Sequence, residues 1–406
     1  MGAPTPPYGR SASVGFAVAV GQLAFVLAAS WAGRQEMPNP ADRTVRAAYE
    51  GLANWDTGWY LSIAKDGYHT PDTLTPADFG NVAFFPGYPL AARGFHAATG
   101  VAWPCSFLII SQLACGIAWT YLLLLLRAAG VAPRGRAVVV GLLLCHPAAF
   151  YLVVGYSEAL FLACFLGMCH WTGRPGRTAL ALAAAHGFAM TATRIIGLPL
   201  AAVPLVAVWF AAGSRWRDLW RPTAVAVVAA AGTVSFFAWC HVRFGRWDLY
   251  FLTEEAGWGI RPNYWTLFTG RQYVLQVGRL MNKATDPHPF DQMMATVVLV
   301  CCYLTAAAEA VWAARGGRGW RQRMPWYAAT AATVYVPLAG QWAAYSQSFT
   351  RYCHTAAVPF LIAWAIALAQ SRWRAWAAGL LAVLAAAGLA YQAAFAAAFG
   401  RGLPAF

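Results

Sequence analysis

The sequence predicts an all-α polytopic membrane protein with about eleven transmembrane helices and a helical first external loop. Composition is the first reason, because only 11% of the 406 residues are charged and 60% are hydrophobic. Soluble domains carry about 25% charged residues. The second reason is that apolar runs of roughly twenty residues, the length that crosses the hydrocarbon of a bilayer, recur along the chain. A soluble fold is therefore excluded.

The apolar runs define the predicted elements in order. We predict spans near 11–31, 105–126, 137–154, 157–171, 178–193, 195–212, 223–242, 291–314, 325–345, 352–370 and 375–397. The first is interpreted as a retained anchor, because no small-residue cleavage site precedes the polar loop. The spans leave two long loops, 32–104 and 243–290, and 1–406 is expected to form a single transmembrane domain.

Arginine predicts the orientation of these spans. Fourteen arginines and one acid, Asp218, lie in five short loops near residues 134, 175, 218, 319 and 373. All five loops fall on one side in the eleven-span prediction, and short cytoplasmic loops carry an excess of Lys and Arg. This predicts a cytoplasmic N-terminus and two long loops on the exported side. Because the basic residues lie at membrane edges, the net charge of +14 does not indicate nucleic-acid binding.

The first long loop is expected to contain an amphipathic helix. Asn39-Pro40 can begin it and Gly67 can end it. Between them, one face repeats at three- and four-residue steps through Leu52, Trp55, Asp56, Trp59, Tyr60 and Ile63. Trp and Tyr favour the membrane–water interface, so this helix is expected on the outer membrane surface. An anchor helix with Asp56 at its polar edge is the alternative to a catalytic role.

Charged residues inside the predicted spans are further candidates. A charge near the bilayer centre costs about 2.5–3.5 kcal/mol on insertion scales, so it usually has a partner or a function. Glu158 and Arg194 map near the outer surface, as Asp56 and Arg351 do, whereas Glu309 maps toward the cytoplasmic half. A structural Glu158–Arg194 pair and a direct substrate role are both open. For Arg351 the alternative is an arginine that snorkels to the interface.

Cysteine and histidine predict neither a disulfide framework nor a zinc site. The nine cysteines fall within or beside the predicted spans, and the eight histidines do not occur at zinc-ligand spacing. His354, about one turn beyond Arg351, is a candidate for substrate contact. No cofactor or metal is predicted, although Asp56 with Asp66 or Asp72 could form a divalent metal site.

Four segments of the chain match the motifs of a known enzyme family. The first-loop signature is matched by Trp55-Asp56-x-x-Trp59-Tyr60-x-x-Ile63-Ala64-x-x-Gly67-Tyr68. The family's FFPxYP, YSESLF and RY motifs are matched in order by Phe84-Phe85-Pro86-x-Tyr88-Pro89, Gly155-Tyr156-Ser157-Glu158-Ala159-Leu160-Phe161 and Arg351-Tyr352. One departure is Gly87, where a bulkier residue is common. With these motifs the chain resembles, from about residue 50 to 365, the PIG-V family, the dolichol-phosphate-mannose-dependent mannosyltransferases of GPI-anchor assembly, in a prokaryotic-type form.

The resemblance implies a GT-C glycosyltransferase that moves a sugar, mannose in the family, from a polyprenyl phosphate with inversion. Its active site would face the exported side, with membrane lipid around it and a lipid, glycan or protein as acceptor. The family's loop acid maps onto Asp56 as general base. The donor phosphate is expected at Arg351, Arg194, Tyr352 and His354. The remaining expected pocket residues are Trp55, Trp59, Tyr60, Tyr68, Phe85, Tyr88, Tyr156 and Glu158.

Two other classes of function stay open. A transporter or flippase of a lipid-linked sugar would also have many spans with charges inside them. It should show paired halves with interrupted helices at matching positions, and no such pattern is visible in the sequence. A non-catalytic subunit of a transferase complex is the other alternative, and arabinose or glucose could replace mannose.

Overall fold

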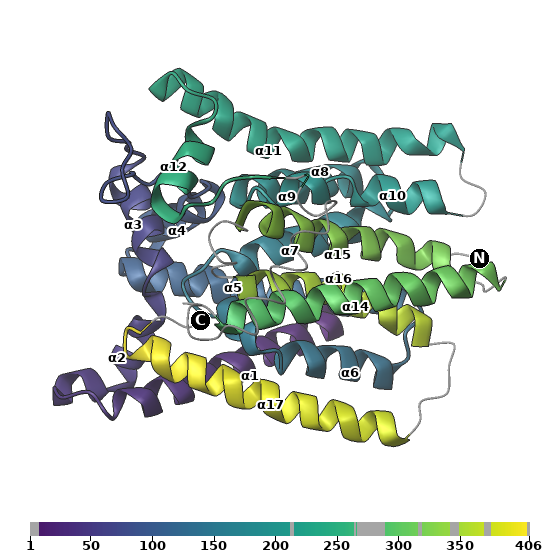
Figure 1. Cartoon of the computed structure of the whole chain (residues 1–406), viewed down its shortest axis with the longest axis horizontal. Helices are drawn as coiled ribbons and strands as arrows, with labels where there is room; N and C mark the ends of the chain where they lie inside the picture. Colours follow the sequence, from purple (N-terminus) through teal and green to yellow (C-terminus); the bar gives the residue numbers. More distant parts are fainter. Residues whose placement is uncertain are drawn as a thin grey trace.

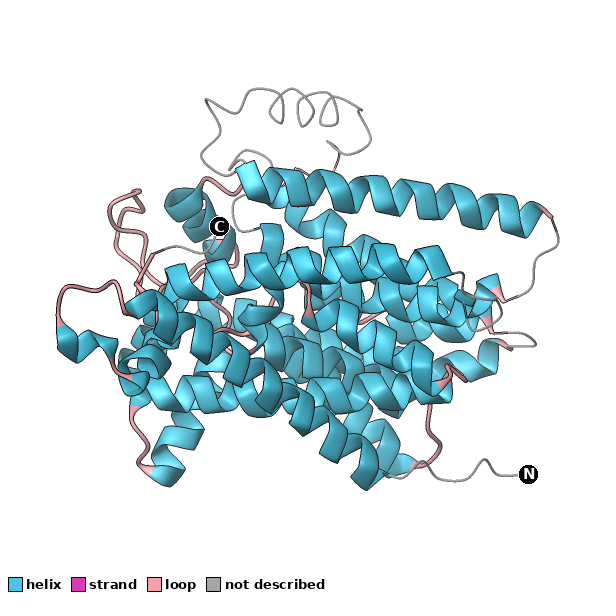
Figure 2. Cartoon of the chain, turned by 90° about the horizontal axis from the view of Figure 1, so that it is seen from below, coloured by secondary structure: helices cyan, strands magenta, loops and turns pink. Residues whose placement is uncertain are grey.

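The computed structural model describes residues 8–211, 215–263, 265, 289–315, 319–341, 349–368 and 375–403. Over these residues the chain is helical, with one isolated β-bridge between Thr75 and Asp78 and no strand. Long helices lie side by side in both views of the molecule (Figures 1 and 2). The predicted all-α class is confirmed.

The long helices are α1 (Tyr8–Arg34), α5 (Trp103–Ala128), α6 (Pro133–Leu144), α7 (Glu158–Thr172), α8 (Arg177–Thr193), α11 (Trp220–Phe244), α14 (Pro289–Ala314), α15 (Trp320–Gln341), α16 (Phe349–Leu368) and α17 (Ala375–Gly400). Four stretches of the described residues are long and apolar enough to cross a membrane: Tyr8–Arg34, Trp103–Ala128, Trp216–Phe244 and Ala382–Gly400. Shorter apolar helices cover Glu158–Thr172, Gly197–Phe210 and Val300–Ala314. These helices mark a membrane protein, but they do not confirm a count of eleven spans.

Two of the predicted spans are not continuous helices. The span near 137–154 divides into α6 and the 3₁₀-helix η3 (Pro147–Leu152), and the span near 195–212 divides into α9 (Gly197–Leu200) and α10 (Val203–Phe210). Proline explains both breaks. It lacks the N–H that a helix interior requires and restricts the residue before it, and Pro147 and Pro204 each stand at the start of the second piece.

Small residues allow the helix that precedes Arg194 to pack closely on its neighbour. A Cβ atom added to Gly187 of α8 would lie 2.7 Å from the Cβ of Ala229 in α11. The Thr233 hydroxyl of α11 also donates to the Thr191 carbonyl at 3.0 Å. Close approach of helix backbones through Gly and Ala is the usual packing mode in lipid. The end of α8 therefore has a defined position.

Three of the basic loops come together at the start of α1. Arg127 donates to the Ser11 hydroxyl at 2.9 Å, the Arg174 guanidinium lies 5.2 Å from the Tyr8 ring centre, and Arg221 donates to the Arg174 carbonyl at 3.0 Å. From Arg177, α8 runs 17 residues, about 25 Å at 1.5 Å per residue, before Arg194. The basic loops and Arg194 thus lie at opposite ends of α8. Residues 316–318 and 369–374, which carry other predicted loop arginines, lie outside the described residues.

Short helices of the two long loops gather at one end of the bundle, where Figure 1 labels α2 (Val45–Glu50), α3 (Asp56–Asp66), α4 (Gly87–Thr99) and α12 (Leu249–Trp258). The 3₁₀-helices η1 (Pro40–Arg43), η2 (Gly51–Ala53) and η4 (Trp216–Leu219) complete the described elements. Most of the second loop beyond α12, residues 266–288, lies outside the described residues.

The first long loop is helical, as predicted, but the prediction of a single helix between Asn39 and Gly67 is wrong. The Asn39 side chain caps η1 and Gly67 ends α3 at φ 84°, so both predicted limits hold. Between them the chain breaks at Thr44, whose hydroxyl caps α2 by accepting from the Ala47 N–H at 3.1 Å. Thr side chains stabilise such breaks because they offer the backbone an alternative hydrogen bond.

Candidate active site

The first-loop motif around Asp56 and the motif that begins at Gly155 lie about a hundred residues apart in the sequence. They are hydrogen-bonded to each other at the end of the bundle where the short loop helices gather. The Gly155 N–H donates to the Leu52 carbonyl at 3.0 Å, and the Thr57 hydroxyl donates to the Gly155 carbonyl at 2.8 Å. A Cβ on Gly155 would lie 2.6 Å from the Thr57 hydroxyl, so only glycine fits. The Asp56 N–H also donates to the Tyr156 hydroxyl at 3.4 Å. These contacts bring Asp56 to the start of α7.

A strained turn at Trp55 precedes the candidate base. Trp55 has φ 56° and ψ −114°, and it is the one non-glycine residue with positive φ among the described residues. Such a conformation is an outlier for a bulky residue. The turn makes Asp56 the first residue of α3, where the helix N-terminus favours a negative charge. The Trp55 side chain itself is half exposed and donates to the Leu403 carbonyl at 3.3 Å.

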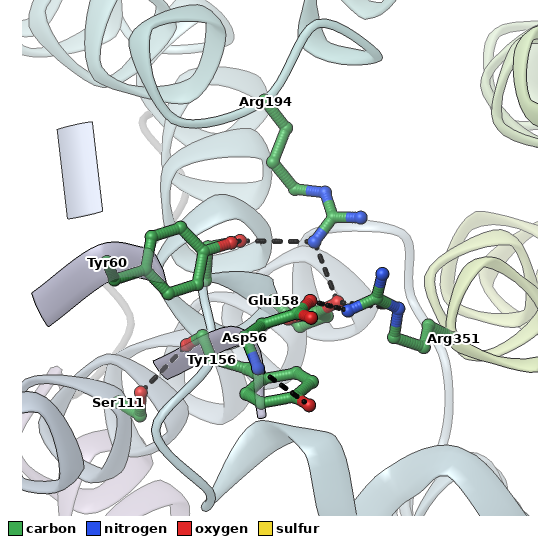
Figure 3. Close-up of polar contacts among 8 residues, drawn as sticks. Asp56, Tyr60, Ser111, Tyr156, Glu158, Arg194 and Arg351 are labelled. Carbon is green, nitrogen blue, oxygen red and sulfur yellow. Dashed lines mark hydrogen bonds and ion pairs between the residues drawn. The ribbon is translucent and has the colours of Figure 1, made fainter. Parts of the chain in front are cut away.

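Two acids and two arginines form one network beside this turn (Figure 3). Arg351, in the first turn of α16, bonds through Nη1 to Asp56 Oδ2. Arg194, which caps α8, donates from Nη1 to Glu158 Oε1 at 2.7 Å, and Arg351 Nε lies 3.8 Å from the same oxygen. The four side chains come from four different elements and are at most 23% exposed. Their formal charges cancel.

Aromatic and hydroxyl groups orient the two arginines. Ser157 Oγ accepts a hydrogen bond from Arg194 at 3.1 Å and lies 3.0 Å from the Tyr60 hydroxyl. The Arg194 guanidinium stacks 5.0 Å from the centre of the Tyr352 ring. The Arg351 guanidinium lies 5.5 Å from the Tyr156 ring centre. Cation–π contacts of this kind fix the plane of the guanidinium as well as its position.

The network keeps unused hydrogen-bonding capacity. Among the described residues, the buried atoms Glu158 Oε2 and Arg351 Nε have no hydrogen-bond partner. A buried polar group without a partner costs about 1–3 kcal/mol, so such groups need an explanation. A ligand that bonds to Arg351 Nε would remove this cost on the arginine side.

Three adjoining cavities surround the network. A central cavity of about 80 Å³ is lined by residues that include Asp56, Arg194, Arg351 and Tyr352. An apolar cavity of about 70 Å³ adjoins it, with Ile195, Tyr250 and Tyr352 in common. An aromatic cavity of about 350 Å³ shares Asp56, Phe84, Arg351 and Tyr352 with the central one and adds Trp55, Trp59, Tyr156 and Trp258.

Larger cavities occur elsewhere in the described chain, but they contain none of the predicted site residues. One of about 710 Å³ is lined by parts of α7, α10 and α15, and one of about 580 Å³ by parts of α14, α15 and α16. Glu309 lines the second of these, where it pairs with Arg323 at 2.6 Å. That pair accounts for Glu309 without a substrate.

The structure brings together most of the predicted site residues. Asp56, Tyr60, Phe85, Arg194, Arg351 and Tyr352 line the central cavity, Trp55, Trp59 and Tyr156 line the aromatic one, and Glu158 joins them through its ion pairs.

Three predicted residues lie outside both these cavities and the ion-pair network. Tyr68 donates to the Phe84 carbonyl at 2.7 Å and packs on Phe236. Tyr88 is fully buried, with its hydroxyl bonded to the Phe107 carbonyl at 2.9 Å. His354 is buried 3.3 Å from the Leu143 carbonyl, because one helical turn carries it past the cavity and into the core. These positions support packing roles for all three.

The second long loop contributes two residues that the sequence analysis missed. Trp258 of α12 packs edge-on against Trp59 and Phe84, with ring centres 6.1 and 5.7 Å apart. Glu254, one turn earlier, lines all three cavities. Burial raises the pKa of Glu254 to about 7. A signal was available, because 249–258 combines aromatic residues with acids, and the Asp56 segment likewise has an acid among aromatic residues.

The carboxylates considered for a metal site do not gather around Asp56. Asp66 stands at the far end of α3, about 15 Å along the helix from Asp56, and both Asp66 and Asp72 are exposed. Within the described ranges, no group of three or more His, Cys, Asp and Glu side chains could hold a metal ion.

Gly87, the departure from the family motif, is explained by close packing next to Arg194. A Cβ there would lie 2.6 Å from the Thr193 hydroxyl and 2.8 Å from the Ala192 carbonyl. We expect Gly87→Ala to displace the end of α8 and to destabilise the protein by about 1–3 kcal/mol, the usual cost of overpacking. Gly94→Ala in the same helix is the matched control, because its Cβ meets nothing within 4 Å. Thermal unfolding in detergent measures both, and equal transition temperatures would contradict the packing argument.

Sequence comparison finds curated relatives. The chain is 37% identical over 135 residues to GPI alpha-1,6-mannosyltransferase 2 of Mus musculus, covering 30% of this chain and 25% of the mouse protein. The Homo sapiens protein of the same name is 32% identical over 133 residues, covering 30% of this chain and 24% of that protein. This chain therefore spans about a quarter of the length of the curated relatives it matches. No family model matches the chain.

Among solved structures, the archaeal oligosaccharyltransferase AglB from Archaeoglobus fulgidus, in complex with an inhibitory peptide and a dolichol-phosphate, aligns with a TM-score of 0.45 and 12% identity. The alignment covers 94% of this chain and 56% of that chain. The sequence relatives bear out the resemblance that the first-loop motif predicted. Over 30% of its length, this chain is similar to the GPI alpha-1,6-mannosyltransferases 2 of mouse, rat and human.

Proposed function

We propose that this chain is an inverting GT-C glycosyltransferase that moves a sugar, mannose, from a polyprenyl phosphate to an acceptor on the exported side of the membrane. One observation carries the proposal. An acid suited to act as a base and an arginine suited to hold a phosphate are in direct contact in a cavity, at the end of α8 remote from the basic loops. The similarity to GPI mannosyltransferases supports the same reaction class.

The donor phosphate would bind between Arg351 and Arg194. Both guanidinium groups line the central cavity, and Arg351 Nε has no hydrogen-bond partner among the described residues. The N-terminus of α16, which carries Arg351 in its first turn, adds a partial positive charge. The phosphate would bond to Arg351 Nε and would compete with Asp56, which bonds to Nη1 of the same guanidinium. Donor binding would therefore release the Asp56 carboxylate for catalysis.

The reaction would then proceed in one displacement. The acceptor hydroxyl oxygen attacks the anomeric carbon, and the bond from that carbon to the phosphate oxygen breaks with both electrons going to the phosphate. The hydroxyl proton passes to Asp56. General-base catalysis supplies about 10²–10⁴ of the rate in such steps. Arg351 and Arg194 stabilise the charge that grows on the leaving phosphate.

The direct test is sugar transfer by the purified chain. Synthetic polyprenyl-phosphate mannose, glucose and arabinose would be offered with a membrane lipid extract and a set of alkyl glycosides as acceptors. We expect the mannosyl donor to be consumed fastest and the product to have the opposite anomeric configuration. Retention of configuration would contradict the displacement, and donor consumption no faster than without protein would contradict the proposed function.

The orientation has its own test. Single cysteines at positions 134, 175 and 218 of a cysteine-free chain should resist an impermeant thiol reagent in intact cells, because arginine-rich short loops stay cytoplasmic. A cysteine at the exposed position 73 of the first long loop should react. Labelling at two of the three arginine-rich positions would show that the proposed orientation is wrong.

A further inference from the structure

Glu254 has a position in the molecule that the proposed reaction does not yet use. It lies in α12 of the second long loop, and it lines the central, apolar and aromatic cavities together. Asp56 is the one other acid of the described residues that lines any of the three. Asp56 is paired with Arg351, whereas no ion pair is described for Glu254.

The three cavities have apolar, cationic and aromatic linings. These follow the same order as the hydrocarbon chain, the phosphate and the sugar ring along a lipid-linked sugar. The apolar cavity is lined mainly by side chains such as Ile195, Phe251 and Pro337. The central cavity contains both arginines, and the aromatic cavity contains Trp59 and Trp258. A polyprenyl-phosphate sugar presents a hydrocarbon chain, then a phosphate, then a ring with polar hydroxyls and apolar faces. Glu254 stands where these environments meet.

We propose that Glu254 binds the sugar of the donor, with its carboxylate accepting hydrogen bonds from the ring hydroxyls next to the bond that breaks. This inference rests on the proposed function and identifies the part of the site that recognises the sugar. Carboxylate acceptors form stronger hydrogen bonds than neutral ones. Glu254 is partly buried and has no ion pair among the described residues; placing an acid in this way is costly, which favours a functional role over a structural one.

The electrostatic surroundings of Glu254 support this role. Its neighbours are the Tyr250 hydroxyl on its own helix, Asp56 on α3, Arg194 after α8 and Arg351 on α16. Burial is the main cause that raises the pKa of Glu254, the Tyr250 hydrogen bond and the two arginines lower it, Asp56 raises it, and the net result is a pKa of about 7. The acceptor form is the carboxylate, which becomes populated as the pH rises through about 7.

Two lipids separate sugar recognition from phosphate recognition. The first is polyprenyl-phosphate mannose, and the second is polyprenyl methyl phosphate, which keeps the chain and the phosphodiester but lacks the sugar. We expect Glu254→Ala to weaken binding of the first by about 10- to 100-fold, the range for hydrogen bonds to a charged group. Binding of the second should change less than about twofold, and Glu254→Asp should recover part of the loss.

Glu255→Ala is the matched control. Glu255 is the next residue of α12, but its side chain is 42% exposed and pairs with Arg261 at 2.6 Å. The Glu255→Ala variant should bind both lipids with wild-type affinity. Wild-type affinity for the mannosyl lipid should also rise between pH 6 and 8 with a midpoint near 7, because neither lipid titrates there. Glu254→Ala should show no such rise.

The outcomes distinguish the two proposals. Wild-type protein that binds neither lipid contradicts the proposed function itself. Wild-type protein that binds both, with Glu254→Ala losing affinity for both equally, shows a structural role and overturns the sugar contact. Unchanged affinity of Glu254→Ala for the mannosyl lipid also overturns the proposed contact between Glu254 and the sugar, while the proposed function stands. A thermal transition of each variant in the same detergent confirms that it is folded.

Discussion

Asp56→Asn should lower sugar transfer by about 10²–10⁴-fold, the contribution of a general base, while the protein still folds and binds donor. Asparagine keeps the size of the side chain and an oxygen that can accept from Arg351, but it cannot take the acceptor proton. The measurement is the turnover rate at saturating donor, with donor affinity determined separately. Asp56→Glu should also be impaired, because one added methylene moves the carboxylate by about an ångström.

Four neighbouring acids serve as controls for this result. Glu50, Asp66, Asp72 and Asp78 belong to the same loop, and none of them lines the central or the aromatic cavity. Amide substitution at each should leave transfer close to the wild-type rate. If Asp56→Asn transfers sugar at a near wild-type rate, the base is a different group and the role assigned to Asp56 is wrong.

Arg351→Ala should have the second large effect, a loss of donor affinity of about 10- to 100-fold or more. Arg351 bonds to Asp56, approaches Glu158 and lines the central and aromatic cavities. Removing it also leaves Asp56 without its cation, whereas Glu158 keeps Arg194, and breaking a buried pair costs about 3–5 kcal/mol of stability. Affinity for polyprenyl methyl phosphate is therefore measured together with the thermal transition.

A conservative variant separates binding from stability at this position. Arg351→Lys keeps the positive charge for Asp56 and should retain most of the stability, but it replaces a planar fork by a point charge and should recover donor affinity only in part. Arg246→Ala is the control, because Arg246 is 56% exposed and pairs with Asp248 at the surface. Donor binding by Arg351→Ala equal to that of Arg246→Ala would remove Arg351 from the site.

The parts of the site that the sequence predicted are those with a local signal. Asp56 was found because an acid stands among tryptophans in one short segment, and Arg351 because it is a lone charge at the start of an apolar run. The same kind of signal was present around Glu254, but the segment lies almost two hundred residues from Asp56 and matched no motif. Glu254 matters because α12 lies next to the ion-pair network in the fold. The spacing of residues along a short segment does not predict where that segment lies in space.

Motif membership and helical spacing predicted too much in some cases. Tyr88 shares a motif with Phe85, and His354 lies about one turn beyond Arg351, but both side chains are buried in the packed core. The first-loop helix from Asn39 to Gly67 satisfied the period, yet Thr44 and Trp55 divide it. The break at Thr44 depends on a side-chain cap and the break at Trp55 on a strained backbone dihedral. The periodic spacing of apolar residues contains no information about either.

The sequence by itself determined the class of the molecule. Composition and apolar length require helices in a membrane, because backbone polar groups cannot stay unpaired in hydrocarbon, and arginine placement predicts which ends share a side. Only the tertiary structure decided that Asp56 pairs with Arg351 and Glu158 with Arg194, and that Glu254 joins them at the cavities. These contacts join residues up to 295 positions apart. They depend on how helices pack, which is a property of the whole chain.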